Sequence, residues 1–269
     1  MNIEVLLSCM NQSDANIAKR INAQSDVVII NQCDMNGSSV ETYMNEKGNP
    51  FHAYFISTTE RGLSRSRNMA IRNAHADICL FSDDDEQLVS DYPETITNAF
   101  ECHPEADLIA FNFLVDGKEQ KKYGERVKQV GKLMALRISS IQIAFRRNAI
   151  LEKGILFDEE MGAGTGHGAG EENKFLYDCL NKGLRIIYIP IVITNLQERQ
   201  SSSWFTGYNE TFYLQKGWAT SRYMGKFNAT LFAIYTTITK YPQYKKNCSS
   251  FGVLKAMLRG IYSKNVFKS

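Results

Sequence analysis

The strongest constraint on the fold is an alternation of short apolar runs with amphipathic runs over the first hundred residues. The apolar runs predict buried strands at residues 3–7, 27–30, 51–56 and 78–81. Between them, apolar residues recur at helical spacing and predict helices at 14–23, 64–74 and 92–100. Strands that alternate with helices over short connections are typical of a mostly parallel sheet with helices on both faces. We therefore expect an α/β domain.

The chain after residue 107 shows a different rhythm. In order, we expect a strand at 108–115, a charged hairpin excursion at 116–132, a strand at 139–145, a glycine-rich loop at 162–170, a helix from Glu171 to near Gly183, a strand at 185–193 and a helical tail from Trp204. These patterns predict an α/β domain at residues 1–205 and a basic, aromatic-rich helical extension at residues 206–269.

Polar or small residues follow each of the first four expected strands. Ligands bind outside the carboxyl ends of the strands in an open parallel sheet. The segments to inspect for chemistry are therefore residues 8–11, 31–34, 57–62 and 82–86.

Three aspartates, Asp83, Asp84 and Asp85, directly follow the fourth expected strand. Adjacent carboxylates repel one another, and at a buried strand end this costs stability unless a cation compensates. Magnesium and manganese ions typically take one or two carboxylates together with substrate phosphates. The triplet therefore predicts a metal–phosphate site, and the alternative is a solvated acidic turn.

Three arginines, Arg61, Arg65 and Arg67, surround the start of the expected helix at 64–74. Free N–H groups at a helix start favour anions, and the guanidinium fork matches phosphate oxygens. Arg65 and Arg67 cannot share one helical face. Since Arg67 precedes the apolar residues 69–71, we expect it to turn inward. The alternative is a solvated basic helix end.

Two glutamates, Glu171 and Glu172, follow the glycine-rich loop at the start of a helix. The plain interpretation is that the helix dipole stabilises carboxylates there. The functional one is that a flexible loop delivers a carboxylate general base to a substrate hydroxyl. His167 could also act in this loop, although a lone histidine in such a loop is more often a surface residue.

The ordered set of these motifs resembles the family 2 glycosyltransferases, which are inverting enzymes with the GT-A fold. The aspartate triplet after an apolar strand resembles the family's DxD motif. Residues 62–70, GLSRSRNMA, are similar to the segment in which Arg and Asn precede the helix leading to that strand. Residues 157–159, FDE, and 170–172, GEE, are similar to the stretch that holds the catalytic base. The resemblance covers roughly residues 3–205.

The resemblance implies a nucleotide-diphosphate sugar donor, most readily a UDP-sugar, and a glycan or lipid-linked glycan acceptor. It implies that Asp83 and Asp85 hold Mn²⁺ or Mg²⁺ and that Glu171 or Glu172 is the catalytic base. The residues implied to bind the donor are Ser8, Asn11, Asn31, Arg61, Arg67, Asp83 and Asp84. A loop at residues 197–204 is expected near the diphosphate or the acceptor.

Three segments depart from the family pattern. Residues 8–11, SCMN, stand where Pro-x-Tyr-Asn is usual. Residues 31–34, NQCD, stand where an acidic run is usual, so we expect amides to recognise the base. Glu171 and Glu172 replace the usual Glu-Asp pair, which leaves open which glutamate is the base.

Two other function classes remain open at this point. A nucleotidyltransferase that makes nucleotide sugars would share a related sheet and metal carboxylates. It usually carries a glycine- and basic-rich phosphate loop after the first strand, where this chain has SCMN at residues 8–11. A non-catalytic nucleotide- or glycan-binding module would keep the aspartates without needing Glu171 or Glu172.

The charge of the chain is divided unevenly. No Asp or Glu follows Glu210, whereas ten Lys and Arg residues do, which leaves 21 basic and 29 acidic residues before that point. A basic, aromatic-rich helical tail indicates an anionic partner, and we expect an anionic membrane surface. A solvated helical cap or a homodimer contact is the alternative. The acidic body argues against a nucleic-acid partner.

The sequence also bears on the expected location. Its N-terminus lacks the basic region and long apolar core of a signal peptide. No apolar run reaches the ~20 residues that a transmembrane helix needs. We therefore expect a cytoplasmic protein, located at the inner face of the membrane if the tail binds lipid.

Overall fold

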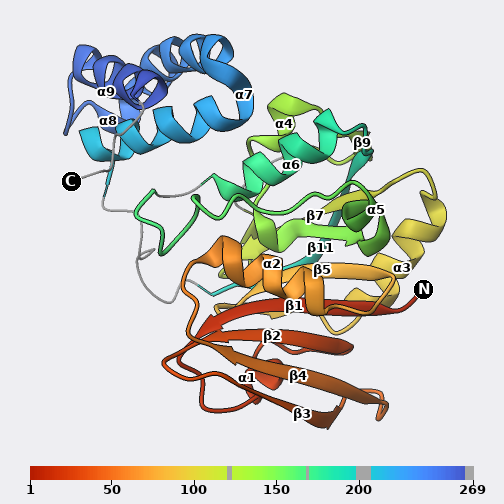
Figure 1. The fold of residues 1–269 in the computed structure, drawn as a ribbon. Helices are drawn as coiled ribbons and strands as arrows, with labels where there is room; N and C mark the ends of the chain where they lie inside the picture. Colours follow the sequence, from red (N-terminus) through yellow and green to blue (C-terminus); the bar gives the residue numbers. More distant parts are fainter. Residues whose placement is uncertain (120–122, 168–169, 198–206, 264–269) are drawn as a thin grey trace.

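The computed structural model describes residues 1–119, 123–167, 170–197 and 207–263. Within them, eleven strands form one sheet in the order β3-β4-β2-β1-β5-β10-β7-β11-β6, with β8 beside β7 and β9 beside β11 (Figure 1). The strands are β1 Ile3–Met10, β2 Asp26–Gln32, β3 Gly37–Met44, β4 Pro50–Thr58, β5 Ile78–Asp83, β6 Glu86–Leu88, β7 Leu108–Val115, β8 Lys118–Glu119, β9 Lys128–Gln129, β10 Ile143–Arg146 and β11 Ile186–Leu196.

The helices cover both faces of this sheet and form a separate group at the C-terminal end. They are α1 Ile17–Arg20, α2 Leu63–Asn73, α3 Tyr92–Cys102, α4 Lys132–Ala135, α5 Arg147–Glu152, α6 Glu171–Asn181, α7 Glu210–Thr239, α8 Tyr241–Tyr244 and α9 Ser250–Tyr262. No described helix is long and apolar enough to cross a membrane.

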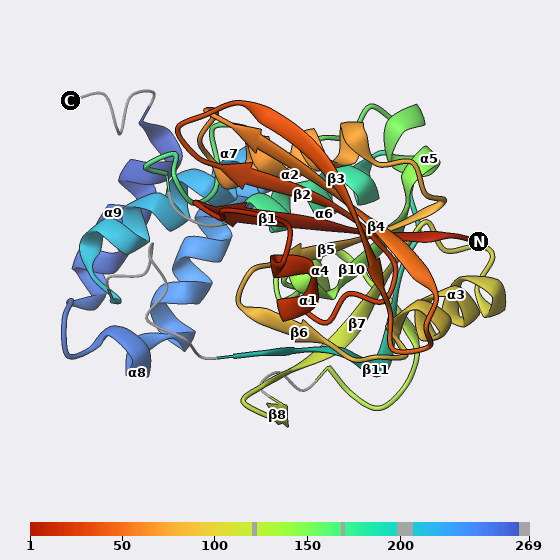
Figure 2. The same ribbon diagram turned by 90° about the horizontal axis from the view of Figure 1, so that it is seen from below.

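The parallel centre of the sheet confirms the α/β prediction. Strand β1 pairs in parallel with both β2 and β5, and β2 pairs in parallel with β4. Side chains of β1 alternate between two cores: Val5 and Leu7 pack with α1 and α3, whereas Leu6 packs with α2 and α6. This period of two explains why β1 is mostly apolar, with Glu4 and Ser8 as its charged and hydroxyl residues, since both of its faces are buried. Figure 2 shows α2 and α3 on opposite faces of the sheet.

Several elements differ from the sequence-based expectation. The helix expected at 14–23 is the single turn α1, which ends where Asn22 adopts a left-handed conformation at φ 59°. The strand expected at 139–145 is β10, which begins only at Ile143, after a 3-10 turn at Ser140–Gln142. Strand β10 runs antiparallel to both β5 and β7.

The excursion at 116–132 forms a hairpin only at its start. Asp116 and Gly117 join β7 to β8 and both have positive φ, as a tight two-residue hairpin requires. Strand β9 instead pairs with β11. The edge strand β3 was not expected, because its sequence GSSVETYM is largely polar and its residues are mostly exposed.

The C-terminal helices form a third apolar core of their own, which includes Tyr213, Ala229, Ala233 and Met257. Gly225 has a φ of 74° and breaks α7 into two helical halves. The expected boundary at 205/206 and most of the expected loop at 197–204 lie outside the described residues, so the domain division stays a prediction.

Two glycines set the crossing of α7 and α9. A Cβ on Gly217 would lie 2.2 Å from the Met257 carbonyl oxygen, and a Cβ on Gly260 would lie 2.1 Å from the Leu214 carbonyl oxygen. The two backbones therefore touch at a point where only glycine fits.

We predict that Gly217→Ala or Gly260→Ala destabilises the helical extension by about 1–3 kcal/mol, because overpacking forces the backbones apart. Urea unfolding followed by circular dichroism measures the change. Gly131→Ala is the matched control, since a Cβ there meets nothing within 4 Å and φ is −98°. Equal stability of the Gly217→Ala variant and the control would contradict the close crossing.

Candidate active site

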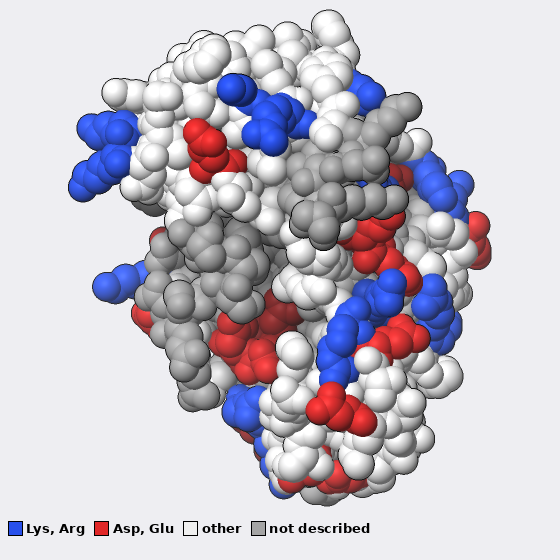
Figure 3. All heavy atoms as spheres, turned by 60° about the vertical axis from the view of Figure 1, so that its left-hand side comes forward, with Lys and Arg blue, Asp and Glu red and all other residues white. Residues whose placement is uncertain are grey.

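The site lies at the edge of the sheet where the parallel strands β1, β2, β4 and β5 end. Figure 3 looks toward this edge and shows acidic side chains gathered in a hollow near the centre of the molecule. Asp83 is the last residue of β5, and Asp84 and Asp85 form the turn into β6. The acidic triplet therefore stands at the carboxyl end of a parallel strand, as expected.

The turn that carries the triplet is tied to the sheet by a buried carboxylate. Glu86 is 2% exposed; it accepts a hydrogen bond from the Asp83 backbone N–H at 3.0 Å and one from the Thr194 hydroxyl at 2.7 Å. Burial raises the pKa of Glu86 to about 8. Strand β11 thus holds the acidic turn in place.

The carboxyl groups of Asp84 and Asp85 are crowded by like charge. Partial burial, and then the charges of Asp83 and Asp84, raise the pKa of Asp85 to about 6, although part of the residue is exposed. The pKa of Asp84 is raised for the same reasons, by burial and by Asp83. A cation bound here would compensate the repulsion between these carboxylates and favour their charged forms.

One buried arginine joins the two acidic motifs. Arg67, on α2, is 2% exposed and lies 3.1 Å from Asp83 and 3.1 Å from Glu171. It also donates a hydrogen bond to the Ser140 hydroxyl at 2.7 Å. Burial disfavours its charge, but the neighbouring carboxylates outweigh burial and raise its pKa. Arg67 turns inward as expected, and protein groups already occupy both of its terminal nitrogens.

Glu171 and Glu172, the first two residues of α6, have different surroundings. Glu171 is 5% exposed, and its second carboxyl oxygen accepts a hydrogen bond from the Gly170 N–H at 3.0 Å. Both of its oxygens are therefore engaged, one by Arg67 and one by Gly170. Glu172 is only half-buried, and its negative charge contributes to raising the pKa of Arg67 and, after burial, that of Tyr223.

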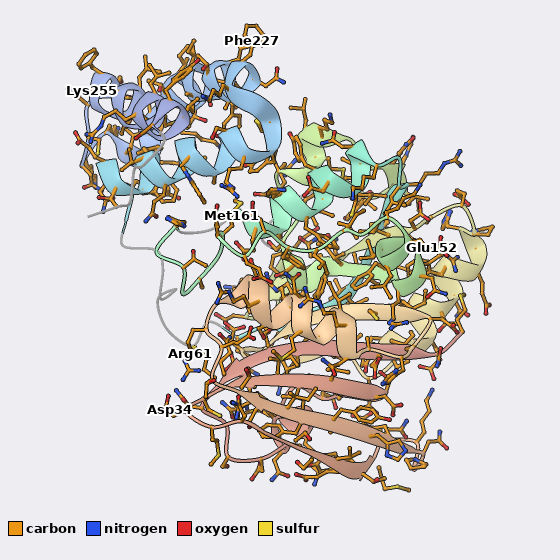
Figure 4. The ribbon with its side chains drawn as sticks, viewed as in Figure 1. Asp34, Arg61, Glu152, Met161, Phe227 and Lys255 are labelled. Carbon is orange, nitrogen blue, oxygen red and sulfur yellow. The ribbon has the colours of Figure 1, made fainter. Side chains whose placement is uncertain are left out.

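The glycine-rich loop is anchored to the start of α2. Ser64 donates a hydrogen bond to the Met161 carbonyl at 2.7 Å, and the Leu63 N–H donates to the Ala163 carbonyl at 3.0 Å. Gly162 has a φ of 97°, and a Cβ there would lie 3.2 Å from both Glu171 and Ser64. Figure 4 labels Met161 between the sheet and the helical extension.

The first half of α7 holds the other side of this loop. The His167 ring lies against Trp218 with ring centroids 4.5 Å apart, and Gln215 donates a hydrogen bond to the Gly166 carbonyl at 3.2 Å. Arg222 forms ion pairs with Asp158 at 2.6 Å and with Glu160 at 2.8 Å. The extension is thus bound directly to the segment that precedes the glutamates.

The remaining residues that were predicted to bind the donor lie along the same edge of the sheet. Ser8 is buried and accepts a hydrogen bond from Ser66 at 2.8 Å, and both ends of the Asn31 amide bind the Gln12 backbone at 2.9 Å. Arg61 forms an ion pair with Asp34 at 2.6 Å and projects at the outer edge (Figure 4). Asn11 is exposed with a φ of 52°.

Three further residues organise the site: Gln32 and Glu86 lie in segments that the sequence had singled out, whereas Ser140 was missed. Gln32 accepts a hydrogen bond from the Gly62 N–H at 2.7 Å, and Ser140 and Glu86 hold Arg67 and Asp83. The side-chain oxygen of Gln32, an amide expected to recognise the base, is instead bound to the Gly62 N–H. Nothing local marks Ser140, because it reaches Arg67 only through the folded chain. In the part of the chain that the structure describes, no group of three or more His, Cys, Asp or Glu side chains is arranged to hold a metal ion.

The fold and the sequence together define a glycosyltransferase. Residues 4–162, more than half of the chain, match the family model described as "Glycosyl transferase family 2". The chain belongs to glycosyl transferase family 2. This assignment decides between transfer and the two alternatives that the sequence left open, a nucleotidyltransferase and a non-catalytic binding module.

Solved structures share the GT-A-like fold. The crystal structure of S. aureus TarS 1–349 in complex with UDP-GlcNAc is 13% identical, with a TM-score of 0.67 over 97% of this chain and 82% of that chain. The complex of the same fragment with UDP is 12% identical, with a TM-score of 0.64 over 97% and 81%. At this identity the likeness establishes the fold. No curated protein sequence matches this chain.

We predict that Arg67→Met destabilises the protein by about 3–5 kcal/mol, because it leaves the buried carboxylate of Glu171 and the partly buried carboxylate of Asp83 without a counter-charge. Chemical denaturation followed by fluorescence measures this loss. Arg65→Met, in the same helix but half exposed and paired with Glu159, is the matched control and should change stability little. A loss from Arg67→Met no larger than the control's would show that the buried ion pairs do not hold the site together.

Proposed function

We propose that the protein transfers a sugar from a nucleotide-diphosphate donor, a UDP-sugar, to a hydroxyl of a glycan or lipid-linked glycan. One observation carries this proposal: the buried guanidinium of Arg67 joins Asp83, at the acidic strand end, to Glu171, the first of the two glutamates. Inverting transfer needs a cationic environment for the leaving diphosphate and a base for the acceptor, on opposite sides of the sugar. The fold shared with a UDP-GlcNAc complex supports the choice of donor.

Asp83 and Asp85 are proposed to hold Mn²⁺ or Mg²⁺. The residues fit such an ion, since the aspartates at this strand end are crowded by like charge and partly exposed. Ions of this class use one or two protein carboxylates and complete their shell with phosphate oxygens and water. When bound, the ion neutralises charge on the diphosphate. The proposed donor-binding residues Ser8, Asn11, Asn31, Arg61, Arg67, Asp83 and Asp84 line or support the same edge.

Arg67 and Asn31 are proposed to act on the donor through other residues. Both are almost fully buried, and the two terminal nitrogens of Arg67 and the amide of Asn31 already bind protein partners, whereas the buried Nε of Arg67 has no hydrogen-bond partner among the described residues. Arg67 orients Asp83 and Glu171, whereas Asn31 fixes the turn after β1 through Gln12. Direct contact with the donor then falls to the exposed residues of this edge, among them Asn11 and Arg61.

Glu172 is the proposed catalytic base, and Glu171 positions it. Both carboxyl oxygens of Glu171 accept hydrogen bonds inside the protein, and little of the side chain is exposed to meet an acceptor. Glu172 takes the proton of the acceptor hydroxyl. The acceptor oxygen then attacks the anomeric carbon from the face opposite the diphosphate, the bond to the diphosphate breaks, and the configuration inverts.

The donor is tested with a panel of nucleotide sugars and Mn²⁺, with free nucleoside diphosphate as the readout. We expect release with a UDP-sugar and loss of metal-dependent donor binding in Asp85→Asn. Asp91→Asn, an exposed aspartate before α3, is the control and should keep full activity. Release of pyrophosphate instead would show nucleotidyl transfer, and undiminished binding in Asp85→Asn would remove that residue from the metal site.

We predict that Glu172→Gln lowers turnover about 10²–10⁴-fold, the usual contribution of a general base. Donor affinity, measured by calorimetry, should stay near that of the parent protein. Glu171→Gln is the comparison: it weakens the pairing with Arg67 and should lower stability, with a smaller loss of turnover. If Glu171→Gln removes turnover and Glu172→Gln does not, the two roles are reversed.

A further inference from the structure

The helical extension exposes apolar residues along one face of each of two helices. On the second half of α7 these residues recur at helical spacing, at Phe227, Leu231, Ile234, Tyr235 and Ile238, and they are 44–76% exposed. On α9, a shallow groove is lined by Phe251, Leu254, Lys255, Leu258, Arg259 and Tyr262. Single exposed apolar residues are ordinary, but two such rows on neighbouring helices are not.

The two rows belong to one continuous surface, which we call the docking face. The Thr230 and Tyr262 hydroxyls hydrogen-bond at 2.9 Å, and the Lys226 ammonium lies 5.8 Å from the centre of the Tyr262 ring. Figure 4 labels Phe227 and Lys255 on the side of the extension that faces away from the sheet. The inward residues of both helices, such as Ala233 and Met257, fill the core of the extension.

The charge of the docking face has one sign. Lys226 lies against Tyr262, and Lys255 and Arg259 line the α9 groove. The outer helices also expose Lys240, Lys245 and Lys246. No Asp or Glu occurs in the sequence after Glu210. The surface therefore combines exposed aromatic and aliphatic side chains with several cations, and Glu210, at the start of α7 and beside Gly252 of α9, is the one acidic residue of the described extension.

We propose that the docking face binds an anionic lipid surface, with the apolar rows entering the interface and the cations meeting the headgroups. A second copy of this chain fits less well, because a two-fold contact through this face would set the same cations against one another. A nucleic acid would pair with the cations but would leave the apolar rows exposed to water.

Docking would fix the active site relative to the lipid. The first half of α7 holds the glycine-rich loop through Trp218 and Arg222, and the second half of the same helix carries half of the docking face. The strand ends and the membrane surface are thereby connected through one short, packed path. The docking face itself does not depend on the donor or base assignments above.

Vesicle co-sedimentation of the full chain tests the proposal. We expect partition onto phosphatidylcholine vesicles that contain phosphatidylglycerol, much weaker partition onto phosphatidylcholine alone, and a decrease with added salt. Lys255→Gln/Arg259→Gln should lower the partition coefficient about fivefold for each cation removed. Phe227→Ser/Ile238→Ser should lower it as well, by removing the apolar contact.

Matched controls separate the docking face from general surface effects. Arg72→Gln removes an exposed cation of α2, and Leu133→Ser removes an apolar residue that is 81% exposed on α4; both should partition like the parent protein. Circular dichroism checks that each variant is folded. Equal loss in the controls overturns the proposal. So does concentration-dependent dimerisation that the Phe227→Ser/Ile238→Ser variant abolishes, or binding to a duplex DNA probe without binding to vesicles.

Discussion

The buried guanidinium of Arg67 is the interaction on which the site depends. It brings together β5 through Asp83, α6 through Glu171 and the turn before β10 through Ser140. Each carboxylate would be costly to bury alone, and the arginine would be costly to bury without them. Neither acidic motif can shift without uncovering a charge, so the distance between the strand end and the glutamates is fixed before any substrate binds.

The elements around Arg67 also show which parts of the fold and site could be predicted from the sequence. Apolar runs and helical spacing predicted the parallel strands and the place of Arg67 on an inward helix face, since these depend on local periodicity. The pairing of Arg67 with Glu171, 104 residues further along the chain, has no local signature. The antiparallel insertion of β10, which delivers Ser140, and the polar edge strand β3 were missed for the same reason: tertiary pairing decided them.

The two glutamates show what could not be predicted about the site. Their position at a helix start after a glycine-rich loop was predicted from the sequence, but the difference in their burial and hydrogen bonding was not. Gly162 allows the loop to pass so close to Glu171 that this carboxylate is enclosed, while Glu172, one residue on, points along another direction of the helix and keeps part of its surface. The close packing of Gly162 thus gives the two adjacent glutamates different environments.

The extension completes the site and does more than cap the domain. Without the first half of α7, the segment from Asp158 to His167 would lose two ion pairs and an aromatic contact. Its remaining anchors would be on the α2 side, at Leu63 and Ser64 and through the contacts of Arg65 and Asn68 with Glu159. The helix that supplies those contacts continues past Gly225 into the exposed apolar row. Helix α9 packs against the first half of α7 at Gly217 and Gly260, and against the second half through the Thr230–Tyr262 hydrogen bond and the shared apolar core. A contact at the outer helices is therefore linked to the loop that precedes the glutamates through close-packed elements, which transmit strain.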